Sequence, residues 1–131
     1  MKRSYLGICM LCIFFMCGCG NSKSNIYNDD KKIAADSDTF SISNSEGEVI
    51  NNEYKEQLTL DGDYTIWQCD CDSDRQTEVA YSLKASNGSA KLVLITPDNK
   101  VNTIVQVTDK KNKSEMTKVK LDLGRGKNRI K

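Results

Sequence analysis

The densest run of reactive side chains in the sequence is Cys69-Asp70-Cys71-Asp72-Ser73-Asp74. Carboxylates at every second position converge on a cation when a loop curls, as in the EF-hand calcium loop. The run departs from that loop at two positions: Arg75 stands where glycine makes the sharp turn, and Tyr81 where a bidentate glutamate belongs. The alternatives are therefore a solvated loop between strands or a calcium site of another kind. The ligands of such a site would be Asp70, Asp72 and Asp74, with Glu78 as an optional fourth.

The two thiols of this run allow three interpretations. Residues i and i+2 of an extended strand have Cα atoms roughly 6.6–6.8 Å apart, at the upper end of disulfide geometry. A Cys69–Cys71 disulfide, which needs a bend, is the first interpretation, and an oxidising compartment favours it. The second is a pair of unreactive thiols whose pKa values are raised by the neighbouring carboxylates. A soft-metal site is the third, and it lacks further ligands because the chain has no histidine.

The absence of histidine also removes the usual general base of hydrolytic enzymes. Catalysis would have to use paired carboxylates, as glycosidases do. We expect no enzyme, because a domain of about 75 residues leaves little room for a substrate cleft of roughly 300 Å³ or more. The carboxylates that could serve in this way are Asp61, Asp63, Asp70, Asp72, Asp74 and Glu78.

Aromatic side chains offer one possible ligand contact. Trp67 is the only tryptophan, and it lies near Tyr64 and Tyr81 in sequence. Such rings can stack on a sugar, but aromatic residues in strands more often fill a core. We therefore predict a half-core role for Trp67 and keep sugar stacking as the alternative.

The beginning of the chain has the organisation of an export signal. Lys2 and Arg3 form a positive region, and an apolar run follows from Leu6 to Met16. Eleven residues rise about 16 Å as a helix, roughly half the thickness of the hydrocarbon layer, so the run is too short to span a membrane stably. No second apolar run follows, which argues against a conventional membrane protein.

The run ends in Met16-Cys17-Gly18-Cys19, which resembles the lipobox of bacterial lipoproteins. The resemblance implies that residues 1–18 are a cleaved signal peptide and that Cys19, the one cysteine here preceded by a small residue, carries a diacylglyceryl group. Two acyl chains, each CH₂ contributing about 0.8 kcal/mol, give stable anchoring. The expected location is the outer face of the cytoplasmic membrane. An ordinary cleaved signal peptide and an uncleaved anchor are the alternatives.

The segment 19–56 is predicted to be a flexible polar tether. Asn, Ser, Asp, Glu and Lys dominate it, and its isolated apolar residues, such as Ile26 and Phe40, follow no helical or strand period. The folded domain is accordingly predicted to occupy 57–131.

From Leu58 onward the apolar residues alternate with a period of two, which is typical of strands. Asn87-Gly88 predicts a hairpin, and Pro97-Asp98-Asn99 predicts a turn. The run 90–96 is predicted to be a central strand, with Leu92 and Leu94 on one face and Val93 and Ile95 on the other. Further strands are predicted around 64–69, 78–85, 101–107, 117–123 and 127–131.

This spacing of strands predicts a small antiparallel β-sandwich. The layout and the ending Leu-Asp-Leu-Gly-Arg-Gly-Lys-Asn-Arg-Ile resemble the Ig-like and jelly-roll modules of bacterial surface proteins, some of which bind carbohydrate. The final strand at Lys127–Lys131 is expected to be a short charged edge, unless the sandwich lacks its closing strand.

The last 23 residues are basic, with nine Lys or Arg and three acidic residues. This basic tail is predicted to be a solvated sheet face; the alternative is a patch for anionic lipid or an anionic wall polymer. Nucleic acid is not expected as a partner outside the cell. The sequence thus favours a lipid-anchored binding or structural module contacting a wall polymer, glycan or protein. A metal-binding or redox accessory using Cys69–Asp74 is the alternative. The basic residues are Lys110, Lys111, Lys113, Lys118, Lys120, Arg125, Lys127, Arg129 and Lys131.

Overall fold

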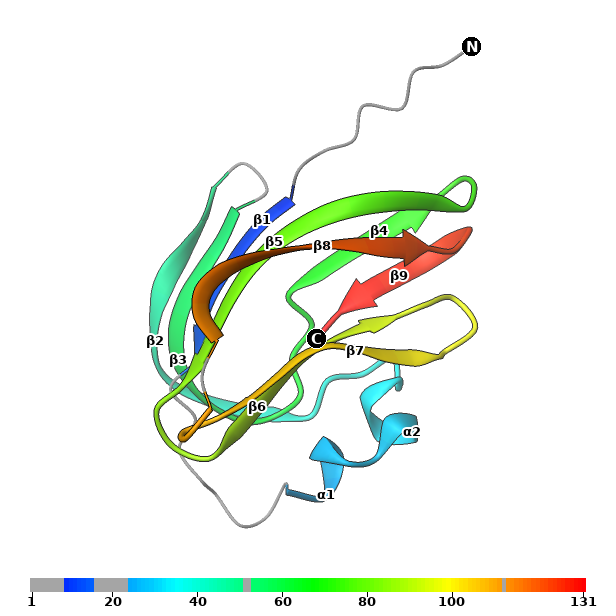
Figure 1. Cartoon of the computed structure of the whole chain (residues 1–131). Coiled ribbons are helices and arrows are strands. Elements are labelled where there is room, and N and C mark those ends of the chain that lie inside the picture. Colours follow the sequence, from blue (N-terminus) through cyan, green and yellow to red (C-terminus); the bar gives the residue numbers. More distant parts are fainter. Residues whose placement is uncertain (1–8, 16–23, 51–52, 112) are drawn as a thin grey trace.

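A computed structural model of the chain describes residues 9–15, 24–50, 53–111 and 113–131. Two β-sheets face each other across a shared core, which confirms the predicted all-β sandwich (Figure 1). The five-stranded sheet has the order β2-β3-β1-β5-β8, and the four-stranded sheet has the order β4-β9-β6-β7. The strands are β1 (Cys9–Phe15), β2 (Phe40–Ile50), β3 (Glu53–Gly62), β4 (Trp67–Cys71), β5 (Arg75–Ala85), β6 (Ser89–Ile95), β7 (Val101–Thr108), β8 (Lys113–Leu123) and β9 (Gly126–Ile130).

Strand β6 is a central strand buried on both faces, as its continuous apolar run predicts. Leu92 and Leu94 belong to the main core between the sheets, and Val93 and Ile95 belong to a second apolar cluster. The neighbouring β7 contributes to both clusters, because a shift of register opposite Leu92 and Val93 interrupts its alternation. Val105 and Val107 consequently face the main core, whereas Val101 packs against the second cluster.

The turn at Asn87-Gly88 is not a hairpin, which corrects the prediction. It connects β5 of one sheet to β6 of the other, and Gly88 has a φ of 80° that suits glycine. The local signal identified a turn correctly, but each strand finds its partners elsewhere: β5 pairs with β8, and β6 with β7 and β9. The predicted turn after β6 does close a hairpin, with Asn99 at a φ of 61° and its N–H bonded to the Thr96 carbonyl at 2.8 Å.

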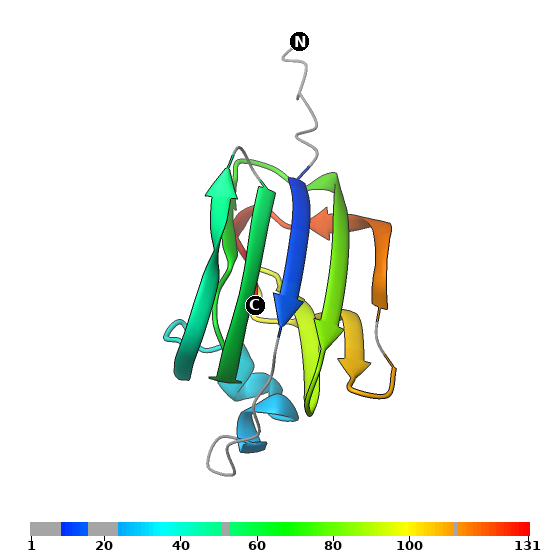
Figure 2. The same cartoon turned by 90° about the vertical axis from the view of Figure 1, so that its left-hand side faces the viewer.

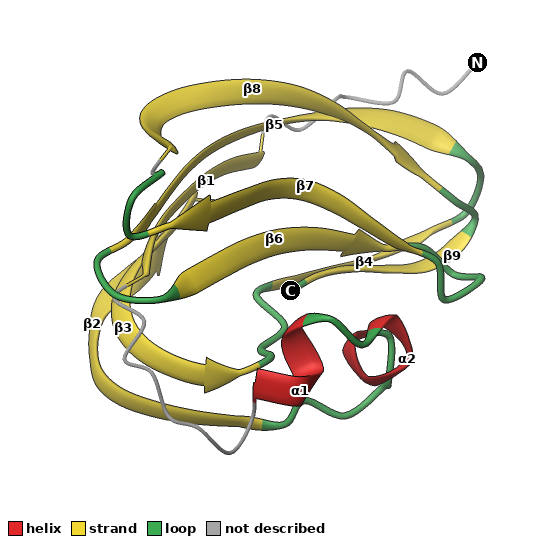
Figure 3. Ribbon diagram, turned by 60° about the horizontal axis from the view of Figure 1, so that its bottom comes forward, coloured by secondary structure: helices red, strands yellow, loops and turns green. Residues whose placement is uncertain are grey.

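The predicted tether over 19–56 is wrong for its described residues. Two short helices, α1 (Ser24–Tyr27) and α2 (Asp30–Ile33), lie against the outer face of the four-stranded sheet (Figure 3). Ile26, Ile33 and Ala34 pack there with Val93 and Ile95. Strands β2 and β3 then form a hairpin of the other sheet. Ile26, Ile33 and Ala34 are single apolar residues that pack on the outer face of the four-stranded sheet without forming a periodic pattern. A search for helical or strand periods therefore does not detect them.

The segment predicted to be the apolar core of a signal peptide is strand β1. It lies between β3 and β5 and runs parallel to both (Figure 2). Leu11 pairs in register with Tyr54 and Tyr81, and Phe15 with Leu58 and Ala85. The predicted lipidation site, Cys19, lies outside the described residues.

The final strand is not the predicted charged edge. Strand β9 pairs with β4 on one side and β6 on the other. Ile130 is only 2% exposed, and the chain end at Lys131 continues the pairing through two backbone hydrogen bonds with Val93. The edge prediction failed because it assumed that charged side chains must face water.

Candidate functional site

The two thiols lie on β4, an edge strand of the four-stranded sheet. Cys69 is in register with Asn128 of β9, and Cys71 with Gly126. Their Sγ atoms are 3.5 Å apart and unbonded, so the structure holds two free thiols in contact rather than the predicted disulfide. The i, i+2 spacing places both side chains on one face of the strand, so little movement separates them from a bond.

The two sulfurs have different surroundings. Cys71 is 3% exposed within the main core, and the Nδ2 of the fully buried Asn128 donates to its sulfur at 3.5 Å. Cys69 is half-buried, and the Nη2 of Arg75 donates to its sulfur at 3.0 Å. Solvent therefore reaches Cys69 more readily than Cys71, and the positive guanidinium of Arg75 lies beside the Cys69 sulfur.

The pKa of the Cys71 thiol is raised. Burial is the largest cause, the neighbouring Cys69 sulfur adds to it, and Arg75 opposes both. The sequence prediction had the direction right for this thiol but assigned the effect to carboxylates. Cys71 is thus a protonated thiol at neutral pH, held next to an accessible one.

The three aspartates of the proposed calcium loop are exposed at the surface. Asp74 accepts a hydrogen bond from the backbone N–H of Arg125 at 2.8 Å. Within the described ranges, no three Cys, Asp or Glu side chains gather closely enough to hold a metal ion. Asp70 and Asp72 are exposed on either side of Cys71.

Trp67 is half-buried and packs against the main core, in register with Ile130. Tyr81 belongs to the other sheet and is buried, and Tyr64 meets Phe40 edge to face with ring centroids 5.0 Å apart. These three rings therefore do not form one surface. The half-core interpretation of Trp67 agrees with its packing.

An open hollow of about 670 Å³ lies beside the thiols. Arg75 connects the two features, because it lines the hollow and contacts the Cys69 sulfur. The hollow is larger than the sequence-based argument about cleft size expected. The sequence does not predict this hollow, because three segments that are distant in sequence form it. Its lining is Asp74, Arg75, Thr96, Pro97, Asp98, Asp122, Leu123, Gly124 and Arg125.

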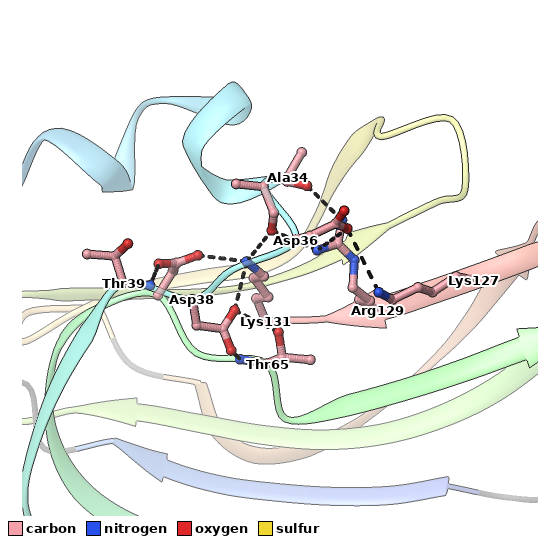
Figure 4. A network of polar contacts seen from close by, with 10 residues as sticks. Ala34, Asp36, Asp38, Thr39, Thr65, Lys127, Arg129 and Lys131 are labelled. Atoms are coloured by element: carbon pink, nitrogen blue, oxygen red, sulfur yellow. Dashed lines mark hydrogen bonds and ion pairs between the residues drawn. The ribbon is translucent and has the colours of Figure 1, made fainter.

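A second polar cluster lies at the end of β9 (Figure 4), and Asp63, Arg129 and Lys131 are its buried members. The Nζ of Lys131 lies 2.8 Å from a carboxylate oxygen of Asp38, 2.8 Å from one of Asp63 and 3.0 Å from the Ala35 carbonyl. Arg129 donates to the carbonyls of Ala34 and Ala35 at 2.7 and 2.8 Å. Cations thus satisfy the backbone at the end of α2, where carbonyl groups lack helical partners.

The carboxylates of this cluster also bind backbone. Asp38 accepts from the N–H and hydroxyl of Thr65, each at 2.8 Å, and Asp63 accepts from the N–H of Thr39 at 2.8 Å. Burial alone raises the pKa of Asp38, but the hydrogen bonds from Lys131 and Thr65 and the charge of Lys131 outweigh it, so this pKa lies below its usual value. The cluster is structural: it joins the segment before β2, the end of β3 and the last residue.

The basic tail is therefore not one surface, which corrects the sequence analysis. Arg129 and Lys131 are buried, and Lys127 lies 3.8 Å from Asp36. The residues of the tail that are exposed in the described part of the chain are Lys110, Lys111, Lys118, Lys120, Arg125 and Lys127.

Comparison with known proteins adds no relationship: no protein-family model, curated protein or solved structure matches the chain. Within the part of the chain that the structure describes, neither helix has the length and apolar character needed to cross a membrane.

Proposed function

We propose that this protein is a bacterial lipoprotein: a β-sandwich held on the outer face of the cytoplasmic membrane by a diacylglyceryl group on Cys19. The observation that carries the proposal is the order of a positive start, an apolar run and Gly18-Cys19. Two acyl chains are enough for stable anchoring. The sandwich then has a binding or structural role at the cell surface, towards a wall polymer, a glycan or a protein.

The test of the anchor compares two cysteines that lie two residues apart. Cys19→Ala should abolish labelling by a fatty-acid analogue and either release the protein from membranes or leave it unprocessed. Cys17→Ala is the matched control, because Met16 before it does not suit a peptidase pocket that accepts small residues. Unchanged lipid labelling of the Cys19→Ala variant would refute the proposal.

A second function, a redox accessory, is favoured by the contact between the Cys69 and Cys71 sulfurs at 3.5 Å and by Arg75 beside Cys69. The co-reactant would be the disulfide of another exported protein. The Cys69 thiolate attacks it to form a mixed disulfide and release one partner thiolate. Cys71, on losing its proton, then attacks Cys69, and the second partner thiolate leaves. The partner is reduced, and Cys69–Cys71 becomes a disulfide.

Thiol alkylation of the reduced protein, before and after incubation with an excess of a small disulfide, tests this second function. The redox function predicts that both thiols react beforehand, with Cys69 reacting first because it is more accessible, and that both are blocked afterwards until reductant is added. Thiols that stay reactive after exposure to the disulfide would count against it. A melting temperature that rises with calcium or zinc would instead favour a metal accessory.

A further inference from the structure

Strand β1, at the centre of the five-stranded sheet, lies in the segment that signal-peptide cleavage would remove. β1 forms six register pairs with β3 and seven with β5. Cleavage before Cys19 takes residues 9–15 away from both neighbours. The following proposal rests on that cleavage.

The space left by β1 has the chemistry of a strand-binding site. Leu58 and Ala85, which flank Phe15 in the register, are both 0% exposed, and Leu83, which pairs with Ile13, is 1% exposed. Without β1, these core side chains would become more exposed. The backbone edges of β3 and β5 that face β1 would lose their hydrogen-bond partners. Unpaired edges beside apolar side chains attract another strand.

The slot is one strand wide, and its two walls are parallel. β3 and β5 lie on either side of β1, so they are two strand spacings apart, roughly 9.5 Å. Closing the slot would require the β2–β3 hairpin to move by about 5 Å towards β5. Among the described strands, β1 is the link between this hairpin and the rest of its sheet (Figure 2).

The buried cluster at Lys131 opposes that movement. Asp63, directly after β3, is held by Lys131 at 2.8 Å and by the N–H of Thr39 at 2.8 Å. Asp38, just before β2, is held by the same lysine. The base of the hairpin is therefore attached to the other sheet, and the two walls of the slot keep their separation.

We infer that the processed protein binds a partner protein by accepting one of its extended strands between β3 and β5, parallel to both. The occupant in the structure defines the chemistry of that strand: seven uncharged residues, Cys-Met-Leu-Cys-Ile-Phe-Phe, with apolar residues at each position that pairs with Tyr81, Leu83 or Ala85. Main-chain pairing supplies affinity, and alternate side chains supply selectivity, as in other cases of strand addition. This gives the proposed binding role a site and a class of ligand.

The experiment uses the lipoprotein purified from its own membrane, with its processing established by intact mass. The probe is a synthetic peptide of the Cys9–Phe15 sequence carrying Cys9→Ser and Cys12→Ser, with lysines at both ends for solubility. We expect saturable one-to-one binding and slower hydrogen exchange of the amides in 53–58 and 79–85. An apolar peptide that adhered elsewhere would leave these amides unchanged.

Two variant peptides make the test specific. Phe15→Glu places a charge between Leu58 and Ala85, so its binding should weaken by about a hundredfold or more. Phe14→Glu pairs instead with the exposed Gln57 and Lys84 and should stay within about threefold of the parent peptide.

Each result decides the proposal. No binding to protein that begins at Cys19, protection without peptide of those β3 and β5 amides that face the slot, or equal effects of the two variants would overturn the slot and leave the lipid anchor intact. A dimer in which a second copy fills the slot would also overturn it. A full-length, unmodified chain would overturn both proposals, and the mass alone identifies that case.

Discussion

The two sheets of this sandwich are completed in different ways. The four-stranded sheet consists of β4, β9, β6 and β7, all from residues 67–131, and its last strand is held by the ion pairs of Lys131. The five-stranded sheet depends at its centre on β1, whose sequence has the features of an export signal. Cleavage before Cys19 would leave every strand of the four-stranded sheet in place. The other contains a strand that processing would remove.

The largest loss of stability is expected when the positive charge of Lys131 is removed from the end of the four-stranded sheet. Lys131→Met leaves the buried Asp63 and half-buried Asp38 carboxylates without their shared partner, so the free energy of unfolding should fall by about 3–5 kcal/mol. Urea denaturation measures the change. Lys127→Met is the control: this exposed lysine lies 3.8 Å from Asp36, and its loss should cost less than about 1 kcal/mol. Equal losses in the two variants would mean that the cluster is not a major source of stability.

Lowering the pH should reduce the stability contributed by the same cluster, by a smaller amount. The folded-state pKa of Asp38 lies below its unfolded value of about 3.9. Its contribution to stability is therefore complete above that unfolded pKa and is lost as the pH falls through the lowered folded pKa. Asp38→Asn should cost about 1.5–3 kcal/mol at neutral pH and should flatten the acid limb of the stability curve.

Denaturation at a series of pH values tests this dependence on Asp38. Asp72→Asn, at an exposed position, is the control and should leave the curve unchanged. An acid limb that is identical in wild type and Asp38→Asn would contradict the assignment.

The smallest effect is expected at the corner that joins the sheets. Gly88 has a φ of 80°, so Gly88→Ala should lower the free energy of unfolding by about 1 kcal/mol. Gly88→Asn should cost less, because asparagine tolerates this conformation better than alanine does. Thermal unfolding of the two variants gives the comparison, and a fully tolerated alanine would place the turn in another conformation.

The strands of residues 67–131 could be predicted because each has a period of two or a continuous apolar run bounded by turn residues. Partner choice could not be predicted from the same signals. Asn87-Gly88 specifies a local reversal, yet β5 and β6 belong to different sheets because burial of their inner faces determines pairing. A two-residue signal contains no information about contacts that form across the sandwich.

The buried cluster shows a second limit. Arg129 and Lys131 resemble solvated charges in sequence, because their partners come from residues 34–38 and from Asp63. Burial of the Lys131 ammonium is tolerated because two carboxylates and one carbonyl from distant segments pair with it. The thiol pair was found from sequence because its two members are neighbours, whereas Arg75 and Asn128 were identified as sulfur contacts only from the fold.

The most direct test of the account is the intact mass of the protein from its native membrane fraction. The proposal predicts a chain that begins at Cys19 and carries the added mass of a diacylglyceryl group, with residues 9–15 no longer present. A full-length, unmodified chain would contradict it, and β1 would then be a permanent strand of the five-stranded sheet.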